Sequence, residues 1–151
     1  METTIKTPKI REIEKVIYNP FVKINVEQKL EILAIRSDKE NLLRIDFIYK
    51  TPSFYENGGW IQMSPDCFIR PCGSSTKLKL VKAENIPLAP SKHFFKTNKD
   101  ILSYSLYFPA IPEDTTSIDI IEYEGPGSNW FNFYGVSLET VRERKIQVII
   151  N

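Results

Sequence analysis

Apolar and polar residues alternate along most of this 151-residue chain. Leu43, Ile45 and Phe47, for example, are separated by the charged residues Arg44 and Asp46. A period of two indicates β-strands that bury one face and leave the other in water. The pattern predicts about nine short strands, drawn from the segments 10–18, 29–36, 43–49, 60–63, 66–70, 77–80, 102–108, 118–120, 130–136 and 145–150.

Turn-forming residues separate these segments. Glycines in 57–59 and 125–127, together with Gly73, favour tight connections, and most of the ten prolines fall between the expected strands. One helix of one or two turns is expected from Ser137, acting as its cap, to Arg144. The pattern is therefore that of an all-β protein with very little helix.

Many short strands with turns between them predict two sheets packed face to face. We expect a single domain over residues 1–151, built as an immunoglobulin-like two-sheet sandwich. A closed β-barrel is the alternative, because only the order of strand pairing distinguishes the two architectures. A chain of this size buries about 70% of its unfolded surface, so its core needs no disulfide or metal.

The charge of the chain is nearly balanced, with 20 basic residues, 19 acidic residues and a net charge of +1. Such a chain lacks the long-range field that draws proteins to phosphate backbones, so nucleic acid is not an expected partner. No apolar run reaches the ~18 residues of a membrane-spanning helix. Residues 1–11 contain no apolar core typical of a signal peptide.

Few residues offer catalytic or metal-binding chemistry. His93 is the only histidine, and it lies in the segment 86–95, where prolines predict a loop and no carboxylate is close. Catalytic sites gather several perturbed groups, and structural zinc needs four Cys or His ligands where this chain has three. Phosphate-binding loops and nucleophile elbows are also missing. We therefore expect no enzyme, no metal and no cofactor.

The two cysteines, Cys67 and Cys72, are five residues apart. On a continuous strand they would point to opposite faces with Cα atoms about 16 Å apart. A disulfide requires Cα atoms within about 7 Å, which only a tight turn at Pro71 would allow. We therefore favour two inert free thiols, buried as small apolar side chains, over a bridge.

Aromatic residues border the two glycine-rich loops. Tyr55 and Trp60 flank one loop, and Tyr123 and Trp130 flank the other. These four are the candidate ligand-binding residues, because loops on a rigid sandwich often carry binding surfaces and flat rings suit sugars and peptides. The alternative is that the rings fill the core and its ends, as large aromatics do in β-proteins.

Several segments stand out together: 59–61 (Gly-Trp-Ile), 64–66 (Ser-Pro-Asp), 86–90 (Ile-Pro-Leu-Ala-Pro) before 93–95 (His-Phe-Phe), 106–112, 118–122 and 130–136. In combination they resemble uncharacterised β-sandwich domains of Bacteroidetes, some of them in predicted cell-envelope proteins. The resemblance covers residues 30–138. It implies a sandwich fold and an extracytoplasmic location, and it implies no activity and no catalytic residues.

Three functional hypotheses follow. The first is a non-enzymatic accessory or binding module for a cell-envelope glycan or protein. The second is a structural or assembly domain that pairs through an edge strand, suggested by the apolar run 146–150. The third is an enzyme that uses His93 with a nearby acid or thiol. The exposure of the loop aromatics and the surroundings of His93 distinguish the first hypothesis from the third.

Overall fold

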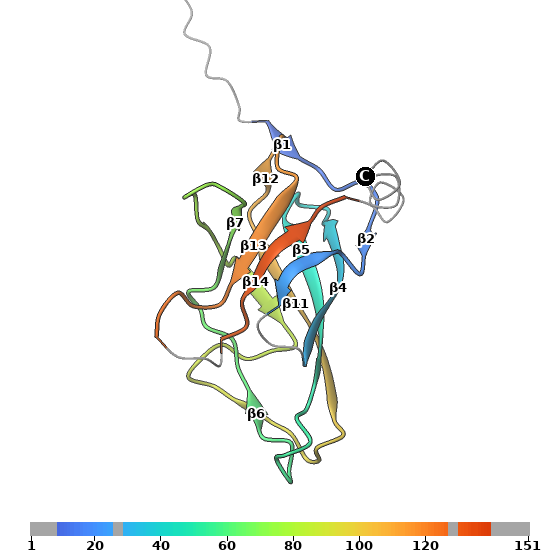
Figure 1. Ribbon diagram of the computed structural model, residues 1–151, viewed down its shortest axis with the longest axis vertical. Helices are drawn as coiled ribbons and strands as arrows, with labels where there is room; N and C mark the ends of the chain where they lie inside the picture. The colour runs from blue at the N-terminus through green and yellow to red at the C-terminus, as the bar shows by residue number, and fades with distance from the viewer. Residues whose placement is uncertain (1–8, 26–28, 127–129, 140–151) are drawn as a thin grey trace, which may run out of the picture.

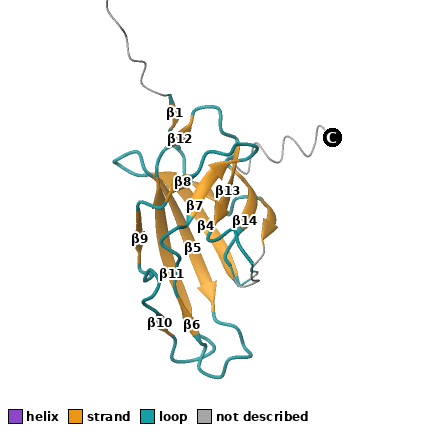
Figure 2. Cartoon of the chain, turned by 90° about the vertical axis from the view of Figure 1, so that its left-hand side faces the viewer, coloured by secondary structure: helices purple, strands orange, loops and turns teal. Residues whose placement is uncertain are grey.

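A computed structural model describes residues 9–25, 29–126 and 130–139, and these residues form strands without any helix (Figure 2). Two five-stranded antiparallel sheets dominate the fold. Sheet I consists, in order, of β2 (Ile17–Tyr18), β4 (Leu30–Ser37), β5 (Leu43–Lys50), β11 (Ile101–Phe108) and β9 (Lys82–Glu84). Sheet II consists of β3 (Val22–Asn25), β14 (Phe133–Ser137), β13 (Ser117–Ile121), β7 (Phe68–Pro71) and β8 (Leu78–Lys79).

Two smaller antiparallel pairs lie at opposite ends of the sandwich (Figure 1). One joins β1 (Ile10–Arg11) to β12 (Ile111–Pro112), and the other joins β6 (Trp60–Ile61) to β10 (His93–Phe94). The predicted two-sheet, all-β sandwich is confirmed. Within the described part of the chain each large sheet is open, with edge strands that pair on one side, so the closed alternative is wrong. The immunoglobulin-like arrangement stays a prediction.

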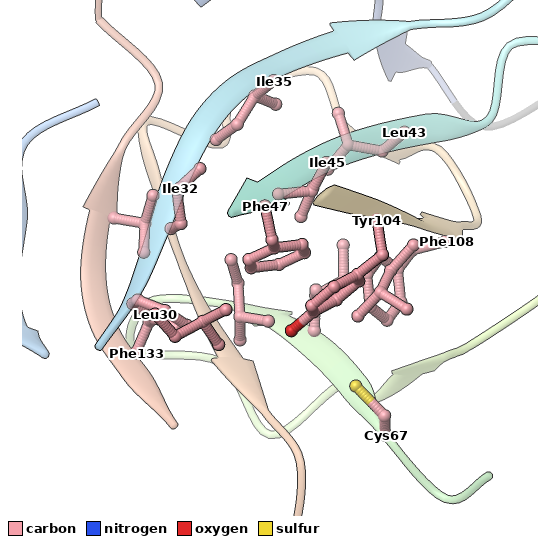
Figure 3. Close-up of a cluster of buried hydrophobic side chains, with 14 of the residues drawn as sticks. Leu30, Ile32, Ile35, Leu43, Ile45, Phe47, Cys67, Tyr104, Phe108 and Phe133 are labelled. Carbon is pink, nitrogen blue, oxygen red and sulfur yellow. The ribbon is translucent and has the colours of Figure 1, made fainter. Parts of the chain in front are cut away.

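The core lies between the inner faces of the two sheets (Figure 3). Phe47 of β5 stacks on Tyr104 of the neighbouring β11, with ring centroids 5.1 Å apart. Its ring also meets Phe133 of sheet II, at 5.9 Å. The other core residues come from both sheets, because every second side chain of a strand points between the layers. Phe47 thus joins the two sheets at the centre of the core.

The outer face of sheet I holds a cluster of charges around Asp46. The Asp46 carboxylate accepts hydrogen bonds from Arg36, Arg44 and Ser105, at 2.8, 2.8 and 2.6 Å. Burial alone would raise the pKa of Asp46, and these donors hold it below its usual value. The charged positions that alternate with the core residues therefore form ion pairs with one another on the outer face.

Several strand boundaries differ from the sequence pattern. The predicted strand 10–18 is two short strands, β1 and β2. Between them the chain does not pair with a neighbouring strand, and the Ile13 N–H donates instead to Ser37 Oγ. Ser137 caps no helix: it is the last residue of β14, and its Oγ accepts the Glu139 N–H. Leu138 and Glu139, which follow it, are not helical either. Residues 140–144 of the expected helix, and the expected strand 145–150, lie outside the described residues.

Both cysteines are free thiols, as predicted. Cys67 is buried in the core, whereas Cys72 is exposed, so the expectation of burial is wrong for Cys72. The reason is that β7 ends at Pro71, and Cys72 already belongs to the turn that leads to β8. Among the described residues, no helix is long and apolar enough to span a bilayer.

Candidate functional site

Two loops form one end of the sandwich, the end that carries β6 and β10 (Figure 2). One loop follows β5 and the other precedes β11. Thr51 donates from its N–H and its hydroxyl to the carbonyl oxygen of Asp100, at 3.2 and 3.1 Å. Asn98 Nδ2 donates to the carbonyl oxygen of Ser53 at 3.1 Å. The two loops are therefore fastened to each other through their backbones.

The second loop is also held from within. The Asp100 carboxylate accepts the N–H groups of Lys96 and Thr97 and the Thr97 hydroxyl, at 2.8, 3.3 and 2.8 Å. The bonds from Lys96 and Thr97 keep the pKa of Asp100 below its usual value. Gly58 packs directly against this loop, because a Cβ at its position would lie 2.2 Å from the carbonyl oxygen of Thr97. The end of the sandwich is thus a fixed platform.

Four aromatic side chains stand out from this platform: Phe54, Tyr55, Trp60 and Phe94, exposed by 76%, 52%, 48% and 68%. We call them the aromatic tip. The rings of Phe54 and Tyr55 contact each other with centroids 4.4 Å apart. Trp60 and Phe94 are directly opposite residues of β6 and β10, so their side chains share one face of that pair. Lys92 Nζ lies 4.2 Å from the centre of the Trp60 ring.

The four sequence-predicted residues form two separate pairs. Tyr55 and Trp60 both belong to the aromatic tip. Tyr123 and Trp130 instead pack on each other, with ring centroids 4.4 Å apart, and Trp130 Nε1 donates to the carbonyl oxygen of Pro126 at 3.3 Å. No contact between the two pairs occurs in the described part of the chain. A ligand role for all four residues stays a prediction.

Phe94 and Lys92 were missed from the sequence. Residues 86–95 contain two prolines and were expected to be a loop around His93, whereas the structure pairs residues 93–94 with β6. The available signal was the neighbouring pair Phe94 and Phe95. On a strand such neighbours face opposite ways, and Phe95 is indeed buried while Phe94 is exposed.

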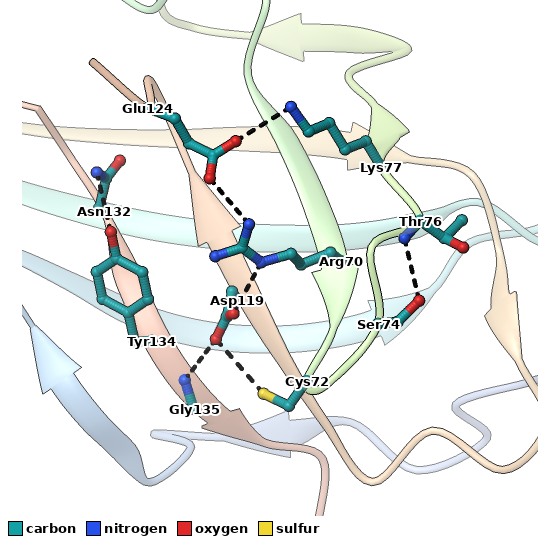
Figure 4. Close-up of polar contacts among 10 residues, drawn as sticks. All are labelled: Arg70, Cys72, Ser74, Thr76, Lys77, Asp119, Glu124, Asn132, Tyr134 and Gly135. Carbon is teal, nitrogen blue, oxygen red and sulfur yellow. Dashed lines mark hydrogen bonds and ion pairs between the residues drawn. The ribbon is translucent and has the colours of Figure 1, made fainter.

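A second cluster of polar side chains lies on the outer face of sheet II (Figure 4). Arg70 bridges Asp119, at 3.0 Å, and Glu124, at 2.9 Å, and Lys77 also contacts Glu124 at 3.1 Å. The Cys72 thiol donates to Asp119 at 3.4 Å. Every charge in this cluster has an opposite partner, so it stabilises the sheet surface and leaves no charged group free for a ligand.

Glu122 is a buried carboxylate that fastens two loops. Its Oε2 accepts the Ser64 N–H at 3.1 Å, and its Oε1 accepts the Phe131 N–H at 3.0 Å. Burial raises the pKa of Glu122, and the two N–H donors oppose that shift only in part. Its own N–H donates to Asn132 Oδ1 at 2.9 Å. Both carboxylate oxygens are used structurally.

The raised pKa of Glu122 makes stability depend on pH. The folded state binds this proton more tightly than the unfolded state, so the group's contribution falls as pH rises from about 4.5 through its folded pKa. Glu122→Gln places an NH₂ group against one N–H donor, which then has no acceptor. We expect this to lower the free energy of unfolding by about 1–3 kcal/mol. We expect urea unfolding to show a larger loss at about pH 4 than at about pH 7.

Asp119→Asn is the control, because the contribution of Asp119 to stability should depend on pH in the opposite direction. Burial alone would raise the pKa of Asp119, but bonds from Gly135 and Arg70 hold it below its usual value. Its contribution is therefore present above about pH 4 and is lost as pH falls below that value. A cost of Glu122→Gln that grows as pH rises would contradict the assigned environment of Glu122.

His93 does not assemble a catalytic group in the described part of the chain. It is exposed, and its ring edge contacts Phe95 at 5.0 Å, without a hydrogen bond or ion pair to an acid or thiol. The buried thiol of Cys67 has a pKa raised by desolvation and by the nearby Glu122, so it stays protonated at neutral pH. Neither residue has the activated neighbour that the third hypothesis requires.

The described residues also contain no group of three or more His, Cys, Asp or Glu side chains placed to hold a metal ion. The aromatic tip is therefore the most distinctive candidate site of this structure. Comparison of the chain with models of protein families, with curated proteins and with solved structures gives no match.

Proposed function

We propose that this chain is a non-enzymatic binding module whose contact surface is the aromatic tip. The observation that carries the proposal is that two pairs of half- to three-quarter-exposed aromatic rings, Phe54 with Tyr55 and Trp60 with Phe94, stand at the same end of the sandwich. Large apolar side chains that cluster on a surface mark sites of contact with a partner. Aromatic residues also dominate the energetics of such contacts.

The rigidity of the platform supports the same proposal. Backbone hydrogen bonds join the two loops, and the Phe95 N–H donates to the carbonyl oxygen of Gly59 at 2.9 Å. Beneath the tip, Phe95 packs on Tyr49 of β5 with ring centroids 5.8 Å apart. A surface that is already ordered loses little conformational entropy on binding.

The test is binding of the whole chain to a panel of glycans, peptides and lipid vesicles, followed by intrinsic fluorescence and by sedimentation. We expect the double variant Trp60→Ala/Tyr55→Ala to weaken binding to at least one class by about tenfold or more. The matched control is Tyr18→Ala/Phe21→Ala, which removes two aromatic side chains of similar exposure elsewhere. Equal binding by both double variants would refute the proposal.

The assembly hypothesis has a specific observation of its own. β3 is an edge strand of sheet II. Phe21, just before it, is exposed by 56%, and Ile24, within it, is exposed by 51%. Exposed edges can pair with a second strand. The run 146–150 that suggested this hypothesis lies outside the described residues. Sedimentation of the chain distinguishes the two proposals, because a strict monomer excludes self-association through this edge.

A further inference from the structure

The surroundings of the aromatic tip identify the class of its partner. Four lysines lie in the segments that form this end of the molecule: Lys50, Lys92, Lys96 and Lys99. The same segments contain two acidic residues, Glu56 and Asp100. Four positive and two negative charges give this end of the molecule a net charge of +2.

The lysine charges are available to a partner. All four side chains are exposed, and none of the ion pairs found among the described residues uses them. Lys92 lies over the Trp60 ring, and Lys96 lies within electrostatic reach of Asp100. The Asp100 carboxylate is already occupied by three hydrogen bonds from its own loop.

The identity of the rings selects among anionic partners. The two most exposed rings, Phe54 and Phe94, have no group that could bond to a sugar hydroxyl or a phosphate. Ile101, exposed by 58%, is a further exposed apolar residue at the start of β11, opposite Lys50. Tyr55 and Trp60 are amphipathic side chains of the kind enriched where a bilayer meets water.

We infer that the aromatic tip docks on an anionic phospholipid bilayer, with its rings in the interfacial region and its lysines at the lipid phosphates. Interfacial apolar groups enter about 5–10 Å of the headgroup boundary, a depth that side chains standing on a loop platform can reach. Each lysine near an anionic surface strengthens binding about fivefold. The inference rests on the proposed function and names its partner.

The experiment measures co-sedimentation of the whole chain with vesicles of phosphatidylcholine alone and of phosphatidylcholine mixed with phosphatidylserine. We expect binding to the mixed vesicles, and loss of that binding in about 0.5 M NaCl, where exposed charges are screened. In a Trp130→Phe background the emission reports Trp60 alone, and it should shift to the blue on binding.

Two double variants separate the contributions. Lys50→Gln/Lys99→Gln should weaken binding to the mixed vesicles about 25-fold, whereas Lys9→Gln/Lys39→Gln, which changes exposed lysines at the opposite end, should not. Phe54→Ser/Phe94→Ser should weaken it about tenfold or more. Because both rings are exposed, the thermal unfolding of this variant should match the wild type.

The inference fails if the wild type does not bind the mixed vesicles at low salt, or if both lysine variants bind equally well. Glycan or protein binding that depends on Trp60 and Tyr55, without vesicle binding, overturns the bilayer as partner and leaves the proposed function standing. Loss of every kind of tip-dependent binding removes both.

Discussion

Replacing Phe47 with alanine is expected to lower the free energy of unfolding by about 3–5 kcal/mol. The ring is 1% exposed and contacts Tyr104 within sheet I and Phe133 in sheet II. The substitution loses the free energy gained by burying the ring. It also leaves a cavity between the two sheets, because the strands of both sheets keep the layers from closing over it. Urea or guanidinium unfolding followed by circular dichroism measures the change.

Phe54→Ala is the control for this prediction. It deletes the same side chain from a surface position that is 76% exposed. Surface changes of this kind stay within about 0.5 kcal/mol of the wild type. Similar losses for the two variants would show that Phe47 does not join the sheets as described.

Replacing Gly58 with alanine is expected to cost about 2–4 kcal/mol and to disrupt the aromatic tip. Gly58 has a φ of +79°, which costs an alanine about 1–2 kcal/mol. Its new Cβ would also lie 2.2 Å from the Thr97 carbonyl oxygen, so the two loops must separate and lose the bonds between them. Chemical denaturation gives the cost, and a red shift of Trp60 emission reports the disruption.

Gly73→Ala provides the matched control. Gly73 has a similar φ of +83°, but nothing lies within 4 Å of a Cβ built there. Gly73→Ala should therefore show the cost of the backbone strain alone, about 1–2 kcal/mol. If both substitutions cost the same, the close contact between the two loops at Gly58 is wrong.

The fold class was predictable because its signal is local. Period-two alternation marked residues 43–49 and 102–108, and these became the central strand β5 of sheet I and its neighbour β11. The short strands gave no such signal. β6, β10 and β12 have two residues each, too few to show a period, and their pairing is set by segments distant in sequence.

The candidate site was predictable in part for the same reason. The glycines beside Tyr55 and Trp60 indicated an exposed loop, which the structure contains. Phe94 is opposite Trp60 only because of the β6–β10 pair, and Lys92, two residues before Phe94, lies over the same ring. Tyr123 and Trp130 showed the same local pattern as Tyr55 and Trp60, yet their rings cover each other. Sequence spacing places aromatic residues near a loop but does not determine what their faces contact.

The position of β14 in sheet II has a consequence for biosynthesis. β3 is made early, yet among the described residues its pairing partner is β14, which follows almost the whole of the described chain. β14 also completes the inner face that covers Phe47. A ribosome must therefore release the chain through β14 before sheet II can close, and Phe21 and Ile24 emerge long before their strand is paired. Long-range pairing of this kind is slow and leaves unpaired edges open to aggregation, so folding of the nascent chain is a late, concerted event.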